Sequence, residues 1–185
     1  MAAARILLVI VCLTALSGFR LPGGGIVGDE KGYKEIVTGR RGPHNDTRRL
    51  IEIARKEIGI REFTENSSPR IDQYLNYVGF RKAPWCACFV SFCFGQAGYK
   101  APKTAWSPAL FPKERLARDA LPGMVMGIYF PSKGRIAHCG IVESLRGDYI
   151  ISIEGNTNVA GSREGDAVMR KLRHKRTIAK YADWL

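Results

Sequence analysis

The chain has 185 residues, of which 45% are hydrophobic and 25% charged, and this balance excludes a collagen-like repeat or a low-complexity disordered chain. The 29 Lys and Arg residues exceed the 17 Asp and Glu residues, and the resulting net charge of +12 favours anionic partners such as nucleic acid, anionic membrane or cell wall. Only the first 20 residues contain a long apolar run, which excludes a polytopic membrane protein.

The amino-terminal segment has the features of a secretory signal peptide. Arg5 precedes an apolar run over residues 6–16, and the small-residue pattern Ala15-Leu16-Ser17 closes the segment. The run is shorter than the roughly 20 residues of a membrane span. We therefore predict a leader over residues 1–17, export, and no stable membrane span once the leader is removed. Retention of the leader as an anchor is the alternative.

A tether and one folded domain are predicted to follow the leader. Residues 18–44 are rich in Gly and mixed charges and lack periodicity, as a tether would be. The domain is expected over residues 45–185. An N-cap at Asp46-Thr47 and apolar residues at helical spacing predict a first helix that ends at Gly59, and the same pattern predicts a second helix over residues 69–77.

The third predicted helix, residues 84–97, is apolar on every side and must therefore be enclosed on every side. From residue 121 onward the pattern changes to strands, which are predicted over residues 124–130, 136–144, 148–154 and 167–173. Helices first and an antiparallel meander afterwards indicate an α+β fold, with the central helix packed on an antiparallel sheet.

Cys86, in the first turn of the central helix, is the candidate nucleophile. A helix N-terminus favours an anion, and a neighbouring imidazolium lowers the pKa of a thiol from its ordinary value of about 8.5. Cys88 and Cys93 lie deeper in the helix and are predicted to be inert core residues. Export would permit a disulfide among the remaining cysteines, and the sequence leaves this open. The spacing Cys86-x-Cys88 lacks the usual zinc-knuckle gap, so we expect neither a metal nor another cofactor.

His138 is the candidate base, because His44 lies in the predicted tether and His174 lies in a basic segment. His138 stands in an otherwise apolar predicted strand, where a lone histidine needs a partner. Alternation along a strand sends His138 and Cys139 to opposite faces, so Cys139 is predicted to be a core residue under the sheet.

The partner of His138 depends on the register of the following hairpin. A three-residue turn centred on Arg146 would place Glu154 opposite His138, whereas a turn centred on Gly147 would place Asn156 there. Either side chain can accept a hydrogen bond from the imidazole and hold the ring for proton transfer. Both registers remain open from sequence alone.

Three blocks in this order resemble the CHAP family of cysteine, histidine-dependent amidohydrolases/peptidases, which are related to the NlpC-type endopeptidases of the papain-like superfamily. The resemblance covers roughly residues 50–173 and is carried by Pro84-Trp85-Cys86-Ala87, His138-Cys139-Gly140 and Glu154-Gly155-Asn156. The chain departs from the family pattern at Met124, where Asp is usual, and at Cys139, where Val is commoner.

The resemblance implies a papain-like fold and cleavage of amide bonds in peptidoglycan, in the bacterial periplasm or cell wall. Cys86 would be the nucleophile, His138 the base and Glu154 the residue that orients the imidazole, with Asn156 as a further polar residue at the site. Trp85 would form either a wall of the substrate cleft or part of the core. The resemblance does not separate an amidase from an endopeptidase, nor a stem peptide from a cross-bridge as substrate.

The net positive charge allows two interpretations of the C-terminal segment, whose basic residues are Arg163, Arg170, Lys171, Arg173, Lys175, Arg176 and Lys180. They either attract the carboxylates of stem peptides or form a solvated face. The alternative to an enzyme is an exported module that binds cell wall or a polyanion and in which Cys86 is structural. Nucleic acid is not expected as a partner, because the leader directs the chain out of the cell.

Overall fold

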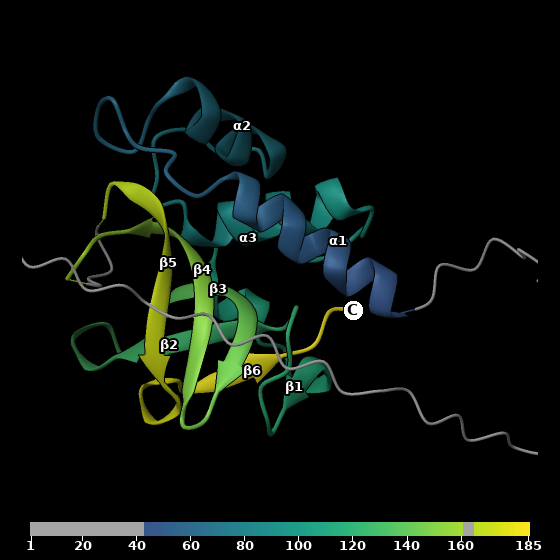
Figure 1. Cartoon of the computed structure of the whole chain (residues 1–185). Helices are drawn as coiled ribbons and strands as arrows, with labels where there is room; N and C mark the ends of the chain where they lie inside the picture. The colour runs from purple at the N-terminus through teal and green to yellow at the C-terminus, as the bar shows by residue number, and fades with distance from the viewer. Residues whose placement is uncertain (1–42, 161–164) are drawn as a thin grey trace, which may run out of the picture. The chain divides into compact units, whose positions relative to one another are not determined.

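The computed structural model describes residues 43–160 and 165–185, which belong to one compact unit, Gly39–Leu185. The predicted leader, residues 1–17, and the predicted tether up to residue 42 lie outside the described residues. The described residues form an α+β fold in which three α-helices lie against a six-stranded antiparallel sheet (Figure 1).

The first two helices are α1, Pro43–Lys56, and α2, Pro69–Tyr77. Helix α1 begins ahead of the predicted N-cap, so that Asp46 lies in its first turn, where a carboxylate complements the helix dipole. The helix therefore includes the last two residues of the predicted tether. Helix α2 has the predicted bounds because Ser68 caps it: the Ser68 hydroxyl accepts a hydrogen bond from the N–H of Ile71.

Helix α3, Cys86–Ala97, is the central helix. It begins two positions later than predicted, which makes Cys86 its first residue, and no side chain caps its N-terminus. It ends at Gly98, whose φ of 99° lies in the left-handed region that favours glycine. Ten of its twelve residues are buried, as expected for a helix that is apolar on every side.

The strands form one sheet in the order β1-β6-β2-β3-β4-β5, with neighbours antiparallel. The four longer strands correspond to the four predicted ones: β2, Val125–Phe130; β3, Arg135–Arg146; β4, Tyr149–Thr157; and β5, Ala167–His174. The other two, β1, Leu116–Ala117, and β6, Lys180–Ala182, were not predicted, because segments of two and three residues carry no readable alternation.

Helix α3 packs directly on strands β3 and β4. The main hydrophobic cluster joins α3 to Ile141 and Ile153, whereas a smaller cluster around Met126 and Val142 lies apart from it. The approach is closest at Gly155, where a Cβ atom would lie 2.7 Å from the Cβ of Phe89. Glycine at this position lets the start of α3 lie close to the end of β4.

The hairpin between β3 and β4 corrects both predicted turns. Arg146 pairs with Tyr149, so the turn contains two residues and not three, and Gly147 adopts a φ of 56° in it. A register shift between Val142 and Ser144 then brings Ile141 opposite Ile153. Nearer the site, the strands therefore recover the register that the turn centred on Gly147 would have given.

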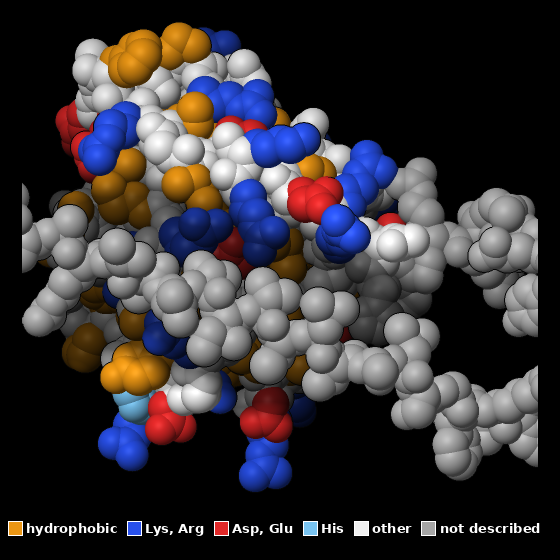
Figure 2. All heavy atoms as spheres, viewed as in Figure 1, with side chains coloured by type: hydrophobic (Ala, Val, Ile, Leu, Met, Phe, Trp, Pro, Cys, Tyr) orange, Lys and Arg blue, Asp and Glu red, His pale blue; other side chains and the backbone are white. Residues whose placement is uncertain are grey.

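Basic and acidic side chains gather where α1 lies beside the sheet (Figure 2). Glu143 of β3 is buried there and forms ion pairs with Arg55 of α1 and Arg170 of β5. These ion pairs connect α1 to the sheet, and they neutralise part of the positive charge of the chain within the fold. Within residues 43–160 and 165–185, no helix combines the length and the apolar character needed to cross a membrane.

Candidate active site

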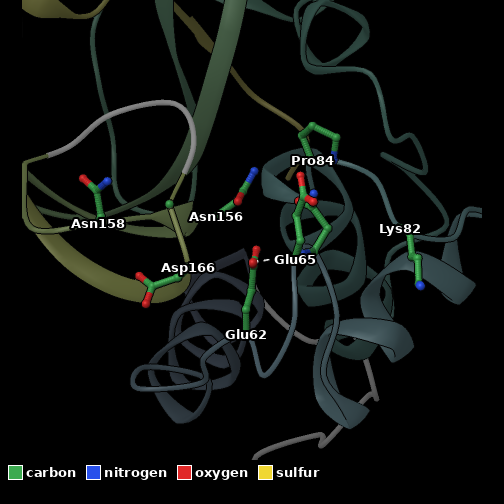
Figure 3. Close-up of a pocket in the computed structure, with 9 residues that line it drawn as sticks. Glu62, Glu65, Lys82, Pro84, Asn156, Asn158 and Asp166 are labelled. Atoms are coloured by element: carbon green, nitrogen blue, oxygen red, sulfur yellow. Dashed lines mark hydrogen bonds between the residues drawn. The ribbon is translucent and has the colours of Figure 1, made fainter.

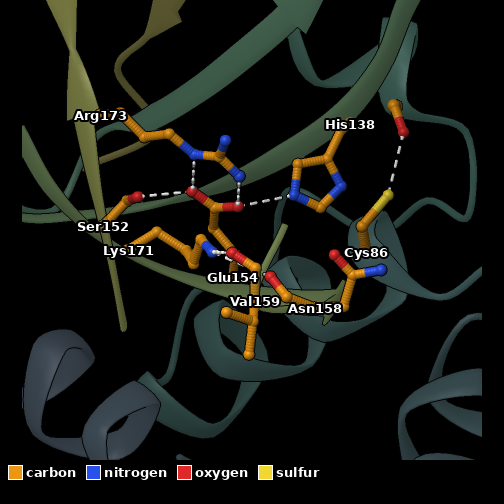
Figure 4. Close-up of polar contacts among 9 residues, drawn as sticks. Cys86, His138, Ser152, Glu154, Asn158, Val159, Lys171 and Arg173 are labelled. Atoms are coloured by element: carbon orange, nitrogen blue, oxygen red, sulfur yellow. Dashed lines mark hydrogen bonds and ion pairs between the residues drawn. The ribbon is translucent and has the colours of Figure 1, made fainter. Parts of the chain in front are cut away.

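The fold brings three of the predicted site residues together (Figure 4). Cys86 is the first residue of α3, His138 lies in β3 and Glu154 lies in β4. The Cys86 residue is 3% exposed, and His138 and Glu154 are completely buried. Because buried ionisable groups are costly unless they are paired, such a cluster needs internal partners.

Glu154 binds one nitrogen of the His138 ring. The distance between His138 Nε2 and Glu154 Oε2 is 2.8 Å, so Nε2–H donates to the carboxylate. The other ring nitrogen, Nδ1, is buried and has no hydrogen-bond partner of normal geometry. In Figure 4 the ring lies between the Glu154 carboxylate and the Cys86 sulfur. This arrangement leaves Nδ1 available for proton exchange with the thiol.

Glu154 reaches His138 diagonally and not from the directly opposed position. Continuing the register from the Ile141–Ile153 pair places Glu154 opposite Gly140. A Cβ atom on Gly140 would lie 2.6 Å from the Cγ of Glu154, so the Glu154 side chain crosses the space that a Gly140 side chain would fill. Gly140 thus makes room for the hydrogen bond to His138.

Two residues that the sequence analysis did not assign to the site hold the same carboxylate. Arg173 donates from Nε to Oε1 at 2.9 Å and from Nη2 to Oε2 at 2.6 Å, and the hydroxyl of Ser152 donates to Oε1 at 2.6 Å. Arg173 had been counted only as one basic residue of the C-terminal segment. Its neighbour Leu172 is apolar yet 56% exposed, so alternation along β5 gave no signal that Arg173 faces the site.

These contacts decide the charges of Glu154 and His138. Burial raises the pKa of Glu154, but the hydrogen bonds from Arg173 and His138 outweigh it and lower the pKa to about 2. Burial would lower the pKa of His138, but its interactions with Cys86 and Glu154 raise the pKa to about 9. At neutral pH the pair is therefore a carboxylate and an imidazolium.

The pKa of the Cys86 thiol shifts in the opposite direction from that of His138. Its pKa is lowered well below the ordinary value, mainly by the Cys139 thiol, with His138 and Ser107 adding to the effect and burial opposing it. The Ser107 hydroxyl lies 3.4 Å from the Cys86 sulfur. The position at the uncapped start of α3 also favours an anion. The site therefore favours a thiolate–imidazolium pair.

Cys139 is a buried core residue, as predicted, but it also borders the site. Strict alternation would let only one of His138 and Cys139 approach Cys86, yet both lower its pKa. The register between β2 and β3 shifts at this point, because Ile128 pairs with His138 and Tyr129 with Ile136. A bulge of this kind increases the local twist of a strand, which accounts for the approach of two consecutive residues.

The remaining cysteines show why Cys86 is distinctive. Burial raises the pKa of Cys88 to about 12 and that of Cys93 well above the ordinary value, so both stay protonated. All four cysteines of the described residues carry free thiols. Within the same residues, no cluster of three or more His, Cys, Asp or Glu side chains could hold a metal ion.

Trp85 belongs to the core, which settles the two alternatives for this residue. The side chain is completely buried, so it cannot line a substrate cleft. Its Nε1–H donates to Oε1 of Glu62 at 2.8 Å, and Glu62 does line a cleft. Trp85 therefore supports that wall from behind.

A cleft of about 610 Å³ opens beside the start of α3 and the end of β4 (Figure 3). Asn156, two residues after Glu154, lines it, and so does Pro84, two residues before Cys86. The remaining lining residues are polar or small, namely Glu62, Glu65, Asn66, Lys82, Asn158, Gly165 and Asp166. Among the described residues Asn156 forms no hydrogen bond with His138, and Glu154 is the residue that binds the ring.

Part of the basic C-terminal segment is engaged internally. Arg170 binds Glu143, Arg173 binds Glu154, and Lys171 donates to the backbone oxygens of Asn158 and Val159. These three cations stabilise the sheet edge and the site and are not free to attract substrate. Arg163 lies outside the described residues.

No protein-family model matches this chain, and no curated protein matches it.

Proposed function

We propose that the protein is an exported cysteine amidohydrolase or peptidase that cleaves amide bonds in peptidoglycan. The observation that carries this proposal is the order Cys86, His138, Glu154, in which the imidazole lies between a thiol and a carboxylate and binds the carboxylate at 2.8 Å. Such a constellation is the minimal arrangement for nucleophilic catalysis by a thiolate.

A papain-like arrangement is part of the proposal. In such a fold the nucleophile begins a central helix that packs on an antiparallel sheet, and the base and its orienting residue come from the sheet. Cys86 at the start of α3, with His138 on β3 and Glu154 on β4, is consistent with this arrangement. The free N–H groups of the first turn of α3 support it further, because they can stabilise an oxyanion.

Cys86, His138 and Glu154 each have a separate role in the proposed reaction. The Cys86 thiolate attacks the amide carbonyl carbon, and the oxyanion forms next to the backbone N–H groups at the start of α3. His138 gives its proton to the leaving amine as the C–N bond breaks, which leaves a thioester on Cys86. Neutral His138 then takes a proton from water, and the resulting attack on the thioester releases the carboxylic acid and restores the thiolate. Glu154 holds the ring in one tautomer throughout.

Digestion of purified peptidoglycan by the full chain tests this proposal. The wild-type protein is expected to release soluble fragments, Cys86→Ala is expected to release none, and Cys88→Ala serves as the matched control on the same helix. Mass spectrometry of the fragments identifies the new termini, which separates an amidase from an endopeptidase. Equal release by wild type and Cys86→Ala would overturn the assignment of the nucleophile.

One observation favours a second candidate, an exported module that binds cell wall or a polyanion without catalysis. Cys86 is only 3% exposed, which suits a structural cysteine as well as a guarded nucleophile. This module would bind peptidoglycan in a pull-down experiment equally well with Cys86 or Ala at position 86, and neither protein would release fragments.

A further inference from the structure

The cleft that Pro84 and Asn156 line carries a charge opposite to that of the whole chain. The chain has a net charge of +12, yet the cleft is lined by three carboxylates and one lysine. The lysine, Lys82, lies at the end of the cleft away from Asn158 (Figure 3). A positive protein with a negative cleft attracts different groups to its surface and to its site, because the local field in a cleft follows its lining charges.

Two of the three carboxylates have no cationic partner. Asp166 forms an ion pair with Arg61 at 2.8 Å and is therefore neutralised. Glu62 and Glu65 form no ion pair with any residue among 43–160 and 165–185. Their charge is available to a ligand in the cleft.

Glu62 is also fixed in place. Its Oε1 accepts from the Trp85 indole at 2.8 Å, and its Oε2 accepts from the backbone N–H of Asn66 at 2.8 Å. Both donors are neutral, so they set the orientation of the carboxylate without supplying a cation to it. Trp85 is next to Cys86 in sequence, which ties this carboxylate to the position of the nucleophile.

Asn156 supplies an independent observation from the opposite wall. It is only 2% exposed, lines the cleft, and its side chain has no hydrogen-bond partner among the described residues. Its φ of 54° is unusual for a residue other than glycine. The amide of Asn156 reaches the cleft, and its oxygen can accept a hydrogen bond from a ligand group that donates one.

From this cleft we infer that the enzyme selects peptides that carry a free primary ammonium group. The inference rests on the proposed function, because it names the substrate class of the same site. Glu62 and Glu65 would supply the opposing charge, and the oxygen of Asn156 would accept one of the three ammonium hydrogens. A divalent cation fits the cleft less well, because no cluster of His, Cys, Asp or Glu among the described residues has the donors for a metal.

Binding to the Cys86→Ala protein tests the inference, because this variant leaves the peptide intact. The probe is a peptidoglycan stem peptide with a free N-terminal amine and a free side-chain amine, titrated by calorimetry into the full chain. The fully acetylated peptide is expected to bind at least tenfold more weakly, as loss of one charge-assisted hydrogen bond requires. Peptides acetylated at only one amine show which of the two the cleft binds, and Ca²⁺ alone is a further titrant.

Two matched variants, made in the Cys86→Ala protein, test whether the preference for the free amine arises in the cleft. Glu65→Gln is expected to weaken binding of the free amine at least fivefold and to leave binding of the acetylated peptide unchanged. Glu114→Gln, which removes an exposed carboxylate outside the cleft, is expected to change neither. Equal binding of free and acetylated peptides, absence of binding, or competition by Ca²⁺ would each overturn the inference. Selective binding by a wild-type protein that cleaves nothing would instead retain the ammonium site and reject the hydrolase.

Discussion

Arg173 and Glu154 form two hydrogen bonds, of 2.9 and 2.6 Å, through the same carboxylate that orients His138. The arginine side chain is 15% exposed and the glutamate is fully buried. The Arg173–Glu154 pair therefore holds the geometry of the site and also stabilises the fold. A buried carboxylate that loses its cation is left with an uncompensated charge.

Replacement of this arginine tests both roles. Arg173→Met is expected to lower the free energy of unfolding by about 3 kcal/mol and kcat/KM by roughly 100-fold, because Glu154 loses its fixed orientation. Arg170, on the same strand as Arg173, provides the control. Arg170→Met breaks the ion pair with Glu143 of β3 and should lower kcat/KM little. Urea denaturation and assays of peptidoglycan hydrolysis measure the two effects. Equal losses of activity in both variants would contradict a role for Arg173 in positioning Glu154.

Gly140 provides a test of the diagonal contact between Glu154 and His138. Gly140→Ala places a methyl group 2.6 Å from the Cγ of Glu154 in the present geometry and must displace that side chain. We expect a cost of about 1–3 kcal/mol in stability, as for other overpacked cores, and a larger proportional loss in kcat than in substrate affinity. Measurement of kcat and KM separately distinguishes this from a general loss of folded protein. An unchanged kcat would show that Glu154 does not need this path.

The charges at the site predict how activity depends on pH. The raised pKa of His138, about 9, means that the imidazolium persists at neutral pH and is lost as the pH rises through that value. The lowered pKa of Cys86 keeps the thiolate present below the pH at which an ordinary thiol ionises. Activity is therefore expected over a broad neutral range and should fall above about pH 9. The rate of alkylation of Cys86 by iodoacetamide at pH 6, compared with Cys88, measures the same pairing; equal slow rates would contradict it.

The same shifts make folding stability depend on pH, with opposite signs at the two ends. Glu154 has a pKa of about 2, below that of an unfolded glutamate, so its contribution is present above roughly pH 4.3 and is lost as the pH falls through 2. His138 has a raised pKa, so its contribution is present below roughly pH 6.5 and is lost as the pH rises through 9. Thermal melting between pH 2 and pH 10 should show both losses. A Glu154→Gln variant should not show the loss of stability at low pH. If that loss persists in the variant, it arises from another carboxylate.

Much of the fold followed from hydrophobic periodicity. Helix α2 and the apolar central helix were predicted because a cap or an all-apolar face leaves a local signal. The two short strands, β1 and β6, were missed for lack of such a signal. The hairpin was misjudged because its turn has two residues and the register of β3 and β4 shifts between Val142 and Ser144. Bulges depend on the partner strand, which local sequence does not specify.

The site was predictable to a similar degree. Cys86 and His138 stood out by residue type and context, but the choice between Glu154 and Asn156 depended on a register that only the folded sheet determines. Arg173 and Ser107 are distant in sequence from the residues they bind, and an arginine in a basic segment gives no local sign of a buried partner.

Cys139, which stands where the resembled family more often has Val, gives the last prediction. Its thiol is the largest contributor to the low pKa of Cys86, and its own pKa is raised well above the ordinary value by burial and by the neighbouring charge of Cys86. It therefore stays protonated and can donate to the Cys86 thiolate. Cys139→Ala removes this donor, so the pKa of Cys86 should rise and the acid limb of the pH–rate profile should move to higher pH. The maximal kcat should change little, because His138 and Glu154 remain. Cys139→Ser, which restores a donor of similar size, should return the limb toward its original position, and a limb that is unmoved in Cys139→Ala would show that His138 and the start of α3 lower the pKa by themselves.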